Sequence, residues 1–255
     1  MTPFPFSKSP VNDLPQASPY FVSNFGYWSE VSNYKDAGVQ FLTEFVRHCH
    51  LTKEASILEV GSGLGGGLVY WKQHFAPKLL SAINLPGEQS NFAKHLWNEN
   101  DVKVKPFLEG GWEQIKTLPS NFYDYVFAVD CAYHFDPLVD FYKEAYRVLK
   151  PEGKLVFNMF HYEKDTKHTF PFILKLFYMP PNQISTVDKT KLQLQQMGFL
   201  IEHELDWTTP VIKGFIQYSQ YLKLSLRIFG SILDKLTNSF QLSYHYYVVK
   251  KVSKL

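Results

Sequence analysis

The chain has 255 residues, and 26 Lys and Arg against 24 Asp and Glu give it a formal net charge of +2. This near balance argues against a polyanionic partner such as nucleic acid. Its two cysteines do not make a disulfide framework, and no stretch reaches the roughly 18 apolar residues that a membrane span requires. The first residues also lack the apolar core of a signal peptide. We therefore expect a cytoplasmic protein.

The first 23 residues are rich in Pro and Ser, which predicts an extended N-terminal segment. Residues 24–255 are expected to form a single domain, with a core over 24–160 and a lid with the final strands over 161–255. Apolar residues at helical spacing predict a first helix within 34–49. Short apolar runs then alternate with helical patterns, which is typical of a parallel sheet covered on both faces. Strands are predicted at 56–60, 78–84, 102–108, 123–130 and 154–160, and helices at 65–75, 87–99, 112–117 and 137–149.

After residue 160 this alternation stops. Residues 185–197 (STVDKTKLQLQQM) predict a helix with Ser185 or Thr186 as its N-cap, and Gly198 ends it. A strand is predicted at 199–207, followed by an amphipathic stretch over 212–238. The last strand is predicted at 240–252 (FQLSYHYYVVKKV).

A glycine-rich turn, EVGSGLG (59–65), follows the first strand directly. Gly61 and Gly63 permit a tight turn and close approach of a ligand, and Gly65 would let the next helix pack onto the strand. A dinucleotide site, the main alternative, calls for an acid about 20 residues later. Here the second strand ends in Asn84. Glu59 instead precedes the glycines, where a carboxylate can meet a cationic amine.

Five motifs follow one another along the first two thirds of the chain. They are LEVGSGLGG (58–66), AINLPGEQ (82–89), EGGWEQI (109–115), YDYVFAVDCAYHF (123–135) and EAYRVLKPEGKLVF (144–157). Their order resembles that of class I S-adenosylmethionine-dependent methyltransferases, in the branch of the tocopherol and sterol methyltransferases and the cyclopropane-fatty-acid synthases. The resemblance implies a Rossmann-like, doubly wound α/β fold. Its seven-stranded sheet would be mostly parallel, with an antiparallel last strand and a C-terminal lid.

The same resemblance implies S-adenosyl-L-methionine as cofactor. The first motif would contact its methionine part, the second its ribose and the third its adenine, on which an indole can stack. The stretch NFGYW (24–28) would close over it. The expected cofactor-binding residues are Tyr27, Trp28, Glu59, Gly61, Gly63, Asn84, Leu85, Gln89, Trp112, Glu113 and Asp130.

Methyl transfer from a sulfonium requires that the acceptor be positioned and that an amine or hydroxyl lose its proton. His134, at the end of the fourth strand, is the expected base, with a structural histidine as the alternative. Tyr133 is the next catalytic candidate, because its phenol could hydrogen-bond the same acceptor. Related N-methyltransferases and cyclopropane synthases have EHF or EHM at the matching stretch. Tyr133 stands here in place of that Glu, which argues against bicarbonate-assisted cyclopropanation.

An aromatic lid favours a hydrophobic or aromatic acceptor. The lining would consist of Phe170, Phe172, Phe177, Tyr178 and Trp207, unless these side chains only pack the lid onto the sheet. We therefore expect methylation of a small molecule at N or O.

Two alternatives stay open. One is a lipid- or sterol-type C-methyltransferase on membranes, although an amphipathic stretch such as 212–238 more often faces a core than a membrane. The other is a non-catalytic subunit with this fold. No metal site is expected, because His48, Cys49 and His50 are too close in sequence to converge on one ion. The sequence leaves the oligomeric state open.

Overall fold

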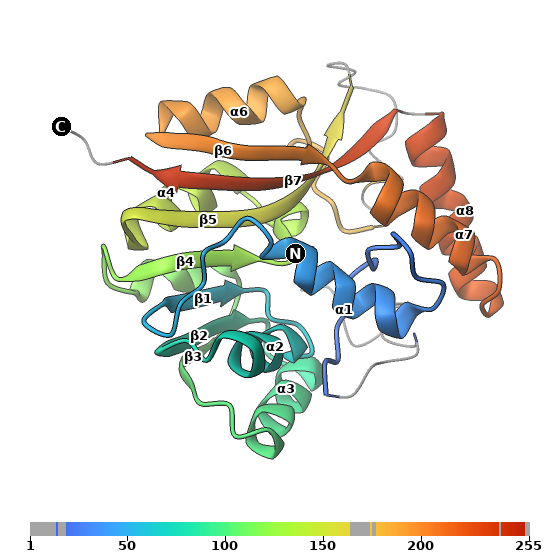
Figure 1. Cartoon of the computed structure of the whole chain (residues 1–255). Helices are drawn as coiled ribbons and strands as arrows, with labels where there is room; N and C mark the ends of the chain where they lie inside the picture. Colours follow the sequence, from blue (N-terminus) through green and yellow to red (C-terminus); the bar gives the residue numbers. More distant parts are fainter. Residues whose placement is uncertain (1–13, 15–18, 164–173, 175–176, 240, 253–255) are drawn as a thin grey trace.

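The structure is a computed structural model that describes residue 14 and residues 19–163, 174, 177–239 and 241–252. Its sheet has seven strands in the order β3-β2-β1-β4-β5-β7-β6 (Figure 1). The last strand runs antiparallel between β5 and β6, which confirms the expected topology. The strands are β1 (Ser56–Val60), β2 (Leu79–Asn84), β3 (Val104–Glu109), β4 (Tyr123–Ala128), β5 (Leu149–Tyr162), β6 (Phe199–Asp206) and β7 (Leu242–Lys251).

The longer helices follow the sequence prediction. The stretch 112–117 forms a 3-10 helix, the amphipathic stretch is divided into α7 and α8, and short helices at 132–134 and 208–213 were not predicted. Thr186 caps α6, since its side chain accepts a hydrogen bond from the Lys189 amide. The helices are α1 (Tyr34–Phe45), α2 (Gly66–Phe75), α3 (Glu88–Glu99), η3 (Trp112–Thr117), η4 (Ala132–His134), α4 (Leu138–Val148), α6 (Val187–Gln196), η5 (Thr208–Lys213), α7 (Gly214–Ser219) and α8 (Leu224–Asn238).

Helices cover both faces of the sheet. On one face, Phe45 of α1 packs edge-on against Phe127 of β4, with ring centroids 5.4 Å apart. On the other face, Tyr142 of α4 lies 5.3 Å from Phe157 of β5. Figure 1 shows α1 and α2 on the near face. All five residues of β1 are buried, and burial on both faces explains why the apolar Ile57 and Leu58 are neighbours in sequence instead of alternating with exposed residues.

The strand order reverses between β1 and β4. β2 and β3 follow β1 on one side, whereas β4 and β5 lie on the other. Ligands of such sheets bind at this reversal, beyond the carboxyl ends of the strands. The glycine turn after β1 and η4 after β4 are both at this edge, and Figure 1 shows α7 and α8 near it. In the described part of the chain, no helix is long and apolar enough to cross a membrane.

Candidate functional site

The chain leaves β1 through a turn in which three glycines have positive φ: +80° at Gly61, +53° at Gly63 and +84° at Gly65. A Cβ on Gly61 would lie 2.7 Å from Cys131 Sγ, so this glycine allows β1 and β4 to end side by side. A Cβ on Gly65 would lie 2.8 Å from Ala93 Cβ of α3. Around Gly63, no described atom would lie within 4 Å of a Cβ. The turn is therefore open to a ligand at Gly63.

Glu59 lies in β1 beneath this turn and is 2% exposed. The Trp71 indole Nε1 donates a hydrogen bond of 2.6 Å to its Oε2. Burial raises the pKa of Glu59 to about 7, and this hydrogen bond opposes the rise. A Cβ on Gly67 would lie 2.8 Å from Glu59 Oε1. Gly67, rather than the predicted Gly65, thus lets α2 approach the strand. The run of three glycines at 65–67 was the sequence signal that could have identified Gly67.

Asn84 ties the glycine turn to β2. Its Oδ1 accepts from the Gly63 amide at 3.1 Å, and its Nδ2 lies 3.3 Å from the Gly63 carbonyl oxygen and 3.0 Å from Ser90 Oγ. The Ser90 hydroxyl in turn donates to the Leu85 carbonyl. Asn84, predicted along the ribose, therefore shapes the turn in this structure. Leu85 and Gln89 lie beside it and are half-buried.

Trp112 is 5% exposed at the start of η3, the short helix that follows β3. Its Nε1 donates to the Asp136 carbonyl at 3.4 Å, and its ring meets Phe141 edge-on at 6.1 Å. Glu113 beside it is exposed. η3 contacts both β2 and α4, and the Trp112 indole itself packs against the segment that follows β4.

The segment before α1 crosses the N-terminus of α2. The Phe21 carbonyl accepts from the Gly66 amide at 3.0 Å, and a Cβ on Gly66 would lie 2.2 Å from that oxygen. The Phe21 ring also packs on Phe92 of α3 at 5.2 Å. Sequence reasoning missed Phe21, because a Pro- and Ser-rich segment gives no signal for such docking.

Tyr27 and Trp28 of the same segment lie against the C-terminal elements. The Trp28 amide donates to the Pro210 carbonyl at 2.7 Å, and its ring lies 4.6 Å from that of Tyr218. Tyr27 meets Trp207 edge-on at 5.2 Å. These contacts join the N-terminal segment to η5 and α7.

Asp130 is a buried residue just after β4 that contacts three separate parts of the chain. It accepts hydrogen bonds from the Phe25 amide and the Tyr133 hydroxyl, both at 2.9 Å, and from the Tyr244 hydroxyl. Burial raises its pKa to about 7, against the effect of these donors. The carboxylate thus holds the N-terminal segment, η4 and β7 together. Tyr133, predicted near the acceptor, directs its hydroxyl to Asp130.

His134 ends η4 at the carboxyl edge of the sheet. Its Nδ1 lies 3.1 Å from the Tyr178 carbonyl oxygen. A carbonyl can only accept, so we assign the proton to Nδ1 and the lone pair to Nε2. Burial lowers the pKa of His134 to about 4. The imidazole is therefore neutral near pH 7 and can accept a hydrogen bond through Nε2.

An aromatic cluster lies next to η4, beneath α7 and α8. Phe25 is at its centre, with ring centroids 5.3 Å from Phe215 and 6.2 Å from both Phe160 and Phe229. Phe177, a predicted lid residue, packs on Phe229 at 4.9 Å. Of the other predicted lid residues, Tyr178 is exposed, Trp207 stacks on Tyr246, and Phe170 and Phe172 lie outside the described residues.

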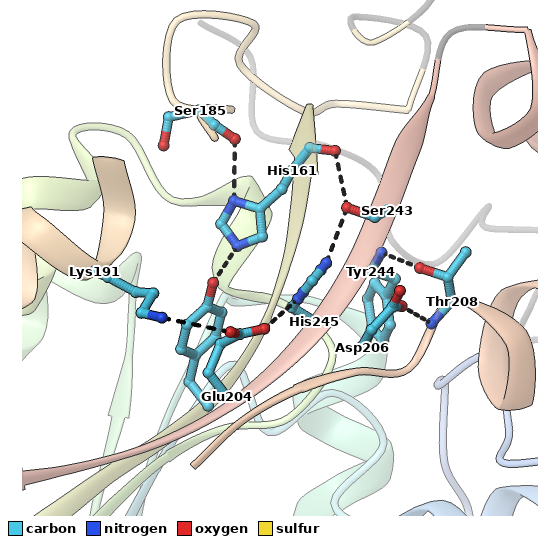
Figure 2. A network of polar contacts seen from close by, with 10 residues as sticks. His161, Ser185, Lys191, Glu204, Asp206, Thr208, Ser243, Tyr244 and His245 are labelled. Atoms are coloured by element: carbon cyan, nitrogen blue, oxygen red, sulfur yellow. Dashed lines mark hydrogen bonds and ion pairs between the residues drawn. The ribbon is translucent and has the colours of Figure 1, made fainter. Parts of the chain in front are cut away.

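A second polar network joins β5, β6, β7 and the start of α6 (Figure 2). His245 Nδ1 lies 2.6 Å from Glu204 Oε1, and its Nε2 lies 2.9 Å from Ser243 Oγ. This serine–imidazole–carboxylate chain has the arrangement of a hydrolase triad.

Two observations favour a structural role for this network. The adjacent recess is lined by the carboxylates of Glu163, Asp188 and Asp206, which would oppose an oxyanion. The neighbouring His161 is fully buried and bridges the Ser185 carbonyl and the Tyr247 hydroxyl. We therefore assign the network to cross-linking the strands. Among the described residues, no group of three or more His, Cys, Asp or Glu could hold a metal ion.

Comparison with known proteins is consistent with this geometry. Residues 58–157 match a family model described as a methyltransferase domain. The chain is 24% identical over 133 residues to the erythromycin 3''-O-methyltransferase of Saccharopolyspora erythraea, which covers 52% of this chain and 44% of that protein. It is 26% identical over 207 residues to a sterol 24-C-methyltransferase of Neurospora crassa, which covers 72% of this chain and 53% of that protein. The chain thus spans about half the length of these relatives.

Among solved structures, the geranyl diphosphate C-methyltransferase of Streptomyces coelicolor has the same fold. Its TM-score is 0.79 at 13% identity, and the superposition covers 98% of this chain and 99% of that one. The fold, the matched domain and the motif order agree. Residues 58–157 are thus similar to a methyltransferase domain, and the chain shares its fold with a methyltransferase of known structure.

Proposed function

We propose that the protein transfers the methyl group of S-adenosylmethionine to the N or O atom of a small hydrophobic or aromatic molecule. One observation carries the proposal. The open side of the glycine turn at Gly63 and the imidazole of His134 stand at the carboxyl ends of neighbouring strands, β1 and β4. Donor and acceptor can therefore meet at the strand reversal.

The cofactor would lie along the edge from β4 to β3. Glu59 supplies negative charge for the ammonium of the methionine part, and Gly61 and Gly63 present bare backbone. Gly87, at the start of α3, also faces open space, with no described atom within 4 Å of a Cβ. Leu85 and Gln89 would flank the ribose there, and Trp112 and Glu113 the adenine. Asn84 would act by holding Gly63 in place.

The acceptor would lie between His134 and the aromatic cluster around Phe25. Aromatic rings favour an apolar or aromatic acceptor by burial and a cationic amine by cation–π contact. His134 Nε2 can accept a hydrogen bond from an acceptor N–H or O–H, which aims the lone pair at the methyl group. A base with a pKa of about 4 holds a proton weakly near pH 7, so we assign positioning of the acceptor to His134 first.

The test is a screen of amines, phenols and lipids with methyl-labelled S-adenosylmethionine, followed by mass spectrometry of the products. His134→Ala should lower kcat by about tenfold or more. The loss of a general acid or base usually costs about 10²–10⁴-fold, and the loss of a positioning contact costs less. Cofactor affinity by calorimetry should stay unchanged. His95→Ala, which alters an exposed side chain paired with Glu99, is the control. Unchanged turnover in His134→Ala would leave it a structural histidine, and cofactor binding without any product would favour a non-catalytic subunit.

A further inference from the structure

α8 has two apolar faces. Its inner face buries Leu226, Leu233 and Leu236. Its outer face carries Leu224, which is 68% exposed, and Ile228, which is 52% exposed. These two residues are four positions apart, so they lie on the same side of the helix. A helix packed on the surface of a water-soluble protein ordinarily has a polar outer face.

Further apolar side chains lie close in sequence to this outer face. Tyr221, in the turn between α7 and α8, is 87% exposed. Ile232 extends the row by one more turn and is half-buried. Along the row runs a shallow groove of about 440 Å³, with Leu224, Ile228 and Ile232 in its lining.

Cations surround this face. Arg227 and Lys235 line the groove, and Lys223 precedes the helix. Between residues 213 and 236 the chain has four cations (Lys213, Lys223, Arg227 and Lys235) and one acid (Asp234). Apolar side chains rimmed by cations match the interface of an anionic bilayer, in which acyl chains lie beneath phosphate groups.

The inner face of the same helical pair meets the proposed acceptor site. Phe215 of α7 and Phe229 of α8 both pack on Phe25, at the centre of the aromatic cluster. One pair of helices thus has the aromatic cluster on one side and the exposed apolar row on the other. A lipid-soluble acceptor could pass from a bilayer to the cluster along these helices.

We propose that α7 and α8 dock the protein on an anionic lipid bilayer. Tyr221, Leu224 and Ile228 insert at the level of the headgroups, and Lys223, Arg227 and Lys235 lie at the phosphates. The proposal deepens the proposed function, on which it rests, because it makes the acceptor a lipid-soluble molecule. It also revises the expectation from the amphipathic pattern, since the helix faces the core and still exposes a second apolar row.

The test is co-sedimentation of the full chain with phosphatidylcholine vesicles, with and without phosphatidylserine. The wild type should bind the anionic vesicles and lose binding at high salt. The double variant Leu224→Glu/Ile228→Glu should lose at least about tenfold in vesicle affinity, because two apolar groups no longer insert. Replacing Lys223, Arg227 and Lys235 by Gln should weaken binding to the anionic vesicles only.

The matched control is Leu192→Glu/Leu200→Glu. These leucines are 54% and 50% exposed, on α6 and β6, outside the proposed surface. No binding by the wild type, or an equal loss in the control, would overturn the proposal. The proposal would also be overturned if light scattering showed that the wild type is a dimer without vesicle binding and that the Leu224/Ile228 variant is a monomer. A second copy of the chain would then cover the row. Cofactor calorimetry without vesicles tests the proposed function separately.

Discussion

The buried carboxylate of Glu59 predicts opposite effects on stability and on cofactor binding. Burial raises its pKa from 4.5 to about 7, which corresponds to about 3 kcal/mol lost from the free energy of unfolding once Glu59 is ionised. Glu59→Gln removes the charge and keeps an oxygen to accept from Trp71. The new amide NH₂ would lie against Gly67 without a hydrogen-bond acceptor, which should lower the free energy of unfolding by about 1 kcal/mol. The ligand-free variant should therefore be more stable by about 2 kcal/mol at high pH.

The sign follows from proton linkage. The pKa of Glu59 is higher in the folded state, so the stability that this group contributes is complete below pH 4.5 and is lost as the pH rises to about 7. The advantage of Glu59→Gln should be absent near pH 4.5 and complete above about pH 7. In a domain of this size, about 2 kcal/mol raises Tm by about 4–8 °C.

The assay is thermal and urea unfolding of both ligand-free proteins at low and high pH, with calorimetry of S-adenosylmethionine binding. The variant should bind the cofactor about ten- to a hundredfold more weakly, because a charge-assisted contact is lost. Glu54→Gln, at an exposed position before β1, controls for the loss of one charge. A ligand-free variant that is less stable than wild type at high pH would refute the reasoning about burial. Unchanged cofactor affinity would refute the placement of Glu59 at the ammonium.

Three further predictions concern residues around the site. Gly66→Ala places a Cβ 2.2 Å from the Phe21 carbonyl oxygen, so amides of residues 20–28 should exchange hydrogen faster and the protein should lose about 1–3 kcal/mol; unchanged exchange would contradict this contact. Asn84→Ala removes both hydrogen bonds to Gly63 and should lower the free energy of unfolding in urea by about 1–3 kcal/mol. The same variant should bind the cofactor more weakly in calorimetry. Burial lowers the pKa of His161 from 6.5 to about 3, so stability is complete above pH 6.5 and is lost as the pH falls. His161→Gln should make urea-derived stability fall less steeply below pH 6.5, by up to about 1.4 kcal/mol per pH unit, and an unchanged slope would argue against the burial effect.

Much of the fold could be predicted because its signals are local. β1 is recognisable from SILEV because a strand buried on both faces favours adjacent apolar residues, here Ile57 and Leu58, over the alternation of a half-exposed strand. Thr186 was recognisable as a cap because its own side chain bonds the backbone three residues later. The antiparallel β7 came from resemblance, since no local pattern in its sequence sets its direction.

The remainder depends on contacts between distant residues. Glu204 and His245 meet because β6 and β7 pair in a register that places Asp206 opposite His245, and a sequence does not reveal register. Phe21 reaches Gly66 across a chain separation that a Pro- and Ser-rich composition cannot indicate. The pattern of α8 shows its apolar positions, but only the folded chain shows that Leu226 is covered while Leu224 is exposed.

The position of β7 has a consequence for the synthesis of this protein. β7 is made after the other six strands of the sheet, yet it lies inside the sheet and is the link between β5 and the edge strand β6. While the ribosome still holds these residues, β5 has an unpaired edge and β6 has no place in the sheet. Unpaired edges favour association between chains. The nascent chain should therefore need protection until β7 has emerged, and a premature stop before β7 should release a product that aggregates even though it contains residues 58–157, the region that matches a methyltransferase domain.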